Sequence, residues 1–133
     1  LAPKHFLEWD TKRSAGGRYD IEYLNAMGMS ATCTDRLDCF TMSSSERVRC
    51  LVQSGFYSEE DGATLVNALA LFTLIEHFIE LQEMTHPGSE EKARRVEHTV
   101  ARALALIDPK WEDARTAISS AKNNVRRVFN HTF

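Results

Sequence analysis

Residues 58–85 read SEEDGATLVNALALFTLIEHFIELQEMT, and this stretch decides the fold. Ser58 is an N-cap candidate, and the three acids that follow it suit the positive end of a helix dipole. Two apolar stripes then recur at helical spacing, namely Leu65, Leu69, Phe72, Ile75 and Ile79, and Leu71, Leu74, Phe78 and Leu81. A helix that is apolar around so much of its circumference must be packed on several sides. We therefore predict a central helix that ends before Pro87 and Gly88.

Shorter amphipathic segments surround the central helix. A first helix is predicted over about 19–29, with Ile21, Leu24 and Met27 on its apolar face. A second follows the serines at 43–45, buries Val48 and Leu51, and stops at Gly55. A fourth is predicted over 89–107, and a fifth begins at Asp108-Pro109 and buries Ile118, Val125 and Val128. No strand-like alternation follows residue 20, so we expect an all-α fold, an antiparallel bundle of about five helices.

The segment of most functional interest is DTKRSAGGRYDIEY at residues 10–23. It joins a predicted extended lead-in and Gly-Gly loop, residues 1–18, to the helical bundle domain, residues 19–133. Gly16 and Gly17 let the backbone adopt positive φ or approach a ligand closely. The next helix would direct its free N–H groups at this loop, and Lys12, Arg13 and Arg18 would add positive charge. The junction could therefore hold an anion, although a tight turn is the simpler interpretation of a lone glycine pair.

For the acidic, histidine and cysteine residues, we favour structural roles over metal binding or catalysis. Asp20 and Glu22 point in different directions on a helix and are poorly placed to chelate one metal ion. We expect Asp20 to accept from backbone N–H groups beside the glycine turn, and Glu22 to pair with Lys12 or Arg18. Glu76 and His77, inside the apolar helix, predict a buried hydrogen-bonded pair rather than acid–base catalysis. The histidines and cysteines follow no metal-ligand spacing, so no metal site is expected.

Composition narrows the possible functions. The 133 residues carry a net charge of −3, which provides no broad positive field for nucleic acid. Glu76 and His77 interrupt the longest apolar run, so no membrane span is expected. The odd number of cysteines, at no zinc spacing, fits a reduced cytoplasmic setting. The chain begins with neither Met nor a signal-peptide pattern, and we expect it to be a piece of a longer polypeptide.

Residues 10–23 resemble the D-x-K-x-x-x-G-G-x-R-[DE]-I-E-F signature of glutamine synthetase adenylyltransferases, relatives of the uridylyltransferases that modify the PII nitrogen-regulatory protein. Residues 68–82 resemble the family's A-Y-x-F-L-R-x-x-E-H-x-L-Q, residues 84–87 are similar to a shortened T-H-x-L-P, and residues 125–130 resemble V-R-x-x-F-D. The chain departs from the family pattern at two positions. Tyr19 replaces an Arg, with Arg18 one place earlier, and Thr73 stands near the Arg of the L-R pair.

The resemblance implies an all-helical domain that follows a nucleotidyltransferase domain in an enzyme of nitrogen metabolism. It also implies ATP and Mg²⁺ as ligands of the parent enzyme rather than of this chain. A nucleotide-phosphate site or domain interface would then involve Lys12, Arg13, Gly16, Gly17, Arg18, Asp20 and Glu22. The family's chemistry needs a G-S followed by D-x-D and a third acid to hold two magnesium ions. Only Gly88-Ser89 gives a G-S, and no D-x-D follows it, so no catalytic residue is expected here.

Three hypotheses follow. The first is a non-catalytic domain that packs on the upstream nucleotidyltransferase domain and helps to position nucleotide or a protein substrate such as glutamine synthetase. It predicts that Lys12, Gly16, Gly17 and Asp20 cluster on one exposed face. A freestanding helical protein-interaction module would instead show a large exposed apolar patch. A small-ligand-sensing module would show a closed apolar cavity with a few convergent polar groups.

Overall fold

The computed structural model describes residues 10–32, 41–85, 98, 101–102, 105 and 114–133. Its regular elements are the α-helices α2 (Arg18–Thr32), α3 (Ser44–Gln53), α4 (Glu59–Thr85) and α6 (Ala114–Thr132), and the described residues form no strand. The predicted all-α class is confirmed. The five-helix bundle is not, because the structure describes four helices.

Several predicted elements fall largely outside the described residues. The lead-in over residues 1–9 and the helix start at Asp108-Pro109 lie entirely outside them. Of the helix predicted over 89–107, only positions 98, 101, 102 and 105 are described, and each is helical. These elements therefore remain predictions.

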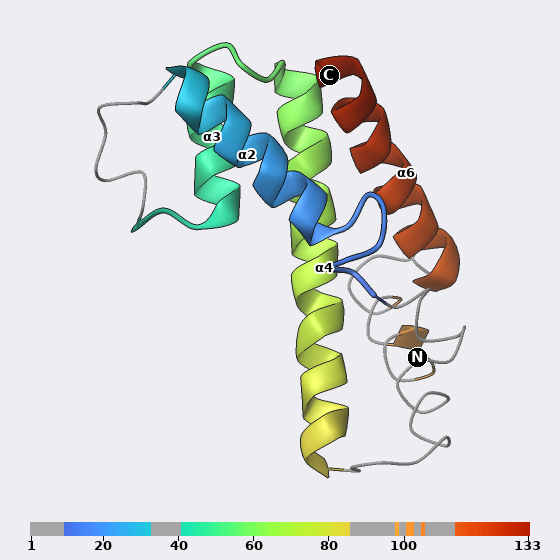
Figure 1. Cartoon of the computed structure of the whole chain (residues 1–133). Helices are drawn as coiled ribbons and strands as arrows, with labels where there is room; N and C mark the ends of the chain where they lie inside the picture. Colours follow the sequence, from blue (N-terminus) through green and yellow to red (C-terminus); the bar gives the residue numbers. More distant parts are fainter. Residues whose placement is uncertain (1–9, 33–40, 86–97, 99–100, 103–104, 106–113) are drawn as a thin grey trace.

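Helix α4 is the axis of the described molecule, as its apolar circumference predicts (Figure 1). Helices α3 and α6 run beside it in the opposite direction, and α2 crosses in front of it obliquely. α4 contacts all three of the other helices, and α2 also contacts α3 and α6. The second half of α4 extends well beyond α2 and α3.

Two clusters of buried side chains hold the helices together. The larger joins all four helices and contains Ile21, Leu24, Val48, Leu51, Tyr57, Leu65, Ala68, Leu69, Phe72, Val125 and Val128. The smaller lies further along α4 and contains Leu71, Ile75 and Ile118. The inward faces predicted for the helices are confirmed at these positions. Met27 and Leu81 are exceptions, because Met27 is 41% exposed on α2 and Leu81 is 55% exposed on α4.

Glycine allows the first helices to approach closely. Gly28 does not end α2, which continues to Thr32. A Cβ atom at Gly28 would lie 2.7 Å from the Phe56 ring, and one at Gly62 would lie 2.2 Å from Val52 Cγ2. A side chain at either position would therefore require the Phe56 ring or the Val52 side chain to shift.

Local capping agrees with the sequence. Ser43 caps α3, with its hydroxyl accepting from Glu46 N and the Glu46 carboxylate accepting from Ser43 N. Gly55, with φ +85°, follows the end of α3, and its N–H donates to Val52 O at 3.1 Å. Ser58 then caps α4 by accepting from Asp61 N at 3.1 Å.

A buried polar pair links α2 to the connection between α3 and α4. The Tyr57 hydroxyl donates to Asn25 Oδ1 at 2.9 Å, and Asn25 Nδ2 donates to Ser44 O at 3.2 Å. Burial, and then the negative charges of Asp61 and Glu22, raise the pKa of the Tyr57 phenol. Tyr57 therefore remains a neutral donor inside the core.

The stretch Glu59–Leu81 of α4 is long and apolar enough to cross a membrane by length and composition alone. Glu76 and His77 do not prevent the helix from meeting this criterion, and the expectation of no membrane span stays a prediction. The core helix of a globular protein passes the same test, and 39% of the most apolar part of this stretch is buried. The packing of three helices on α4 favours that interpretation.

Candidate functional site

The residues before α2 form a tightly bonded bend, defined here as residues 10–17. The Asp10 carboxylate accepts from the N–H groups of Lys12 and Arg13, each at 3.0 Å. Gly17 N donates to Ser14 O at 2.9 Å, and Gly16 has φ +81°. The bend leads directly into Arg18, the first residue of α2.

Both glycines of the bend are buried, and each is crowded for a specific reason. A Cβ atom at Gly16 would lie 2.1 Å from Lys122 O, on the backbone of α6. A Cβ atom at Gly17 would lie 2.7 Å from Thr11 O and 2.9 Å from Ser14 O, within the bend itself. The expectation that the glycines share an exposed face with Lys12 is therefore wrong. Internal packing requires glycine here, whatever a ligand would need.

The N–H groups at the start of α2 are already bonded. Arg18 N donates to Thr11 O at 2.6 Å, and Tyr19 N donates to Lys12 O at 2.9 Å. Asp20 N and Ile21 N both donate to Gly17 O, at 3.2 and 3.5 Å. A helix N-terminus binds an anion through free N–H groups, and here the chain itself takes up these donors.

The Arg18 guanidinium is held by the middle of α4. Its Nε donates to Glu76 Oε1 and its Nη2 to Glu76 Oε2, each at 3.0 Å, and Nη2 also donates to Thr73 Oγ1 at 2.7 Å. The buried Thr11 hydroxyl donates to the same Glu76 Oε1 at 3.1 Å. The side chains of the pair are only 20% and 17% exposed, so this bidentate contact fixes the bend on α4.

Arg18 and Thr73 meet at this contact. The short Thr73 side chain leaves room for the Arg18 guanidinium, which donates to its hydroxyl. A second arginine at position 73 would place two like charges at one spot.

Asp20 joins the bend to α6. Its Oδ2 accepts from Gly16 N at 2.6 Å and from Arg126 Nη1 at 3.1 Å. The predicted role of Asp20, accepting from backbone beside the glycines, is confirmed. Arg126 was not anticipated, because 106 positions separate the two residues and no local pattern relates them.

Glu22 and His77 differ from expectation. The Glu22 carboxylate accepts from the Ser44 hydroxyl and lies 3.8 Å from Arg47 Nη1, so its partners are on α3 rather than in the bend. His77 is exposed, so the predicted buried pair with Glu76 is wrong. Only Glu76 faces inward, and its partner is Arg18.

The cations Lys12 and Arg13 lie on the outer side of the bend. Both residues are exposed, and neither side chain forms an ion pair with another described residue. Beside them is a cleft of about 230 Å³, lined by Asp10, Thr11, Lys12, Glu76, Ile79 and Glu80. Of the residues singled out from the sequence, these two cations are the ones available to an external anion. The described residues contain no group of three or more His, Cys, Asp or Glu side chains placed to hold a metal ion.

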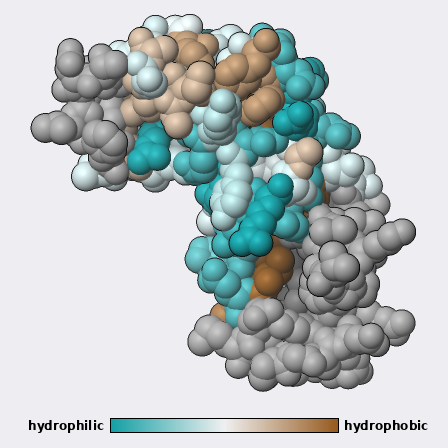
Figure 2. Space-filling view, viewed as in Figure 1, coloured by the Kyte–Doolittle hydropathy of each residue, from teal (hydrophilic) through white to brown (hydrophobic). Residues whose placement is uncertain are grey.

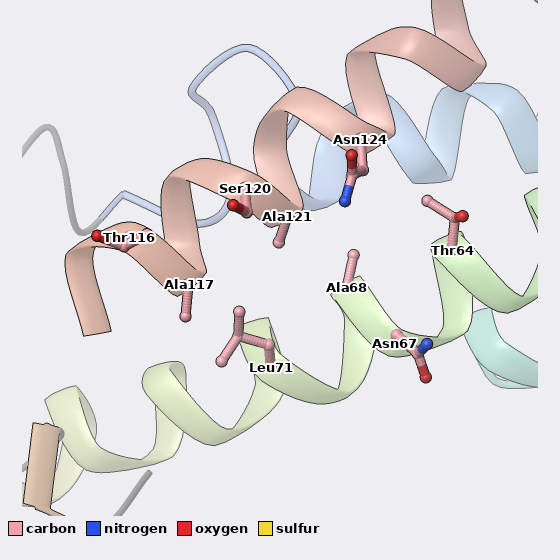
Figure 3. Close-up of a pocket in the computed structure, with 9 residues that line it drawn as sticks. All are labelled: Thr64, Asn67, Ala68, Leu71, Thr116, Ala117, Ser120, Ala121 and Asn124. Atoms are coloured by element: carbon pink, nitrogen blue, oxygen red, sulfur yellow. The ribbon is translucent and has the colours of Figure 1, made fainter. Parts of the chain in front are cut away.

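A second concavity lies between α4 and α6 (Figure 3). It has a volume of about 360 Å³ and is lined by Thr64, Asn67, Ala68, Leu71, Thr116, Ala117, Ser120, Ala121 and Asn124. Ala68, Leu71 and Ala117 point into the space between the helices, while the Asn67 amide points away. The lining carries no charged side chain and mixes small apolar with polar residues. It differs from the closed apolar cavity predicted for a small-ligand sensor.

Comparison with known proteins gives one informative similarity. Over 116 residues the chain is 29% identical to the bifunctional glutamine synthetase adenylyltransferase/adenylyl-removing enzyme of Corynebacterium diphtheriae. This similarity covers 84% of the chain but 11% of the relative, so the chain spans about a tenth of that enzyme's length. No protein-family model matches the chain, and no solved structure matches it. The similarity supports a loose relationship to adenylyltransferases that regulate glutamine synthetase.

Proposed function

We propose that this chain is a non-catalytic helical domain of a nucleotidyltransferase related to the glutamine synthetase adenylyltransferases. The observation that carries the proposal is the similarity along 84% of the chain to 11% of such an enzyme. A match that covers most of this chain but only a tenth of the relative is expected for a related domain rather than for a whole enzyme. The all-helical structure is compatible with that role.

The bend would be the part of this domain that meets the catalytic domain. Because the backbone donors at the start of α2 are bonded within the chain, contact would depend on the exposed side chains of Lys12 and Arg13. The role of Gly16, Arg18 and Asp20 would be structural, because their contacts hold the bend against α4 and α6. The two cations would then attract a nucleotide phosphate or a carboxylate of the neighbouring domain.

The remaining parts of the proposal concern the parent enzyme. ATP and Mg²⁺ would bind its catalytic domain, because nucleotidyl transfer requires carboxylate-held magnesium. Glutamine synthetase would be the protein substrate, and the enzyme would work in the cytoplasm. The helical domain would contribute by orienting these partners rather than by chemistry.

The first test is the coding sequence upstream of Leu1. The proposal expects a nucleotidyltransferase region there, with a G-S followed within about a dozen residues by D-x-D. An upstream sequence without such a region would contradict the proposal.

The second test measures activity of the polypeptide that includes the upstream region. With ATP, Mg²⁺ and glutamine synthetase, it should transfer labelled adenylyl groups to the protein. Replacing Lys12 and Arg13 together by Ala should lower kcat/KM several-fold while leaving the melting temperature unchanged. Arg127→Ala removes an exposed cation of α6 and is the matched control. An equal loss of kcat/KM in both variants would mean that the net positive charge of the domain, rather than the position of these cations on the bend, affects activity.

A further inference from the structure

We draw no further inference here: the strongest candidate, the exposed aromatic surface of α2 and the end of α6, where Figure 2 shows hydrophobic atoms gathered, carries nothing because no described residue shows what covers it.

Discussion

Two glycines in this protein adopt nearly the same backbone conformation in very different surroundings. Gly16 has φ +81° and Gly55 has φ +85°. A Cβ atom at Gly16 would collide with the α6 backbone, at 2.1 Å from Lys122 O, whereas nothing lies within 4 Å of one at Gly55. The same residue type thus serves a tertiary contact in one place and a local helix ending in the other.

The hydrogen bonds follow the same division. Gly55 N donates to Val52 O, three positions earlier. The contacts of Gly55 therefore come from residues close to it in the sequence. Gly16 N donates to Asp20, whose carboxylate also accepts from Arg126 on α6. A helix stop can therefore be identified locally, but the bend is defined by a distant helix.

The largest expected effect is that of Gly16→Ala. The side chain must occupy both a left-handed conformation and space held by backbone, so the free energy of unfolding should fall by about 3 kcal/mol or more. Urea unfolding followed by circular dichroism measures this change. A loss no greater than that of Gly55→Ala would show that α6 does not pack on the bend.

Glu76→Ala should have the next largest effect. It leaves Arg18 and Thr11 without their shared carboxylate in a partly buried place, at a cost of about 2 kcal/mol in the free energy of unfolding. Glu80→Ala removes an exposed carboxylate one turn away and should change stability by less than about 0.5 kcal/mol. Equal effects of the two variants would contradict the Arg18–Glu76 contact.

Gly55→Ala should cost only about 1 kcal/mol, because its penalty is conformational and the surrounding space is open. Asn tolerates positive φ better than Ala, so Gly55→Asn should recover part of the loss. The comparison of melting temperatures for Ala and Asn isolates the backbone term. If Asn is worse than Ala, side-chain crowding rather than φ controls this position.

The smallest effect on stability is expected when Lys12 and Arg13 are both replaced by Ala. Both are exposed, so the free energy of unfolding should change by less than about 0.5 kcal/mol. Calorimetry of the isolated chain checks this. A larger loss would mean that these cations help to hold the bend and are not available to an external anion.

Gly17→Val illustrates why the structure is needed to choose a test. From the sequence, this substitution would ask whether the glycines bind a phosphate. In the structure, a Cβ atom at Gly17 would crowd Thr11 O and Ser14 O, so the variant would disturb the bend with or without a ligand. Substitutions of Lys12 and Arg13 separate binding from folding more cleanly.

Local sequence rules predicted the local structure well. The serine caps at Ser43 and Ser58, the stop at Gly55 and the buried stripe of α4 all depend on residues within a few positions of one another. Met27 shows the limit of periodicity. Spacing places it among apolar residues of α2, yet the outer side of that helix is exposed. A repeat indicates an apolar face but not whether anything covers it.

The candidate site was predicted only in part for a related reason. Glu22 found its partners on α3, and Glu76 found Arg18 rather than His77. These pairs join residues far apart in the chain, and oppositely charged residues are too numerous for sequence to choose among them. The one available signal was the Glu76 carboxylate within the most apolar segment of the chain, which requires a partner but does not identify it.

By itself the sequence determined the helical class, the central position of residues 58–85 and the local caps, because helix periodicity and capping act over a few residues. The tertiary structure alone decided that Gly16 lies beneath α6, that Arg18 is bound to Glu76, and that Lys12 and Arg13 remain exposed. Those outcomes depend on how helices distant in sequence pack against one another. That packing is a property of the folded chain as a whole.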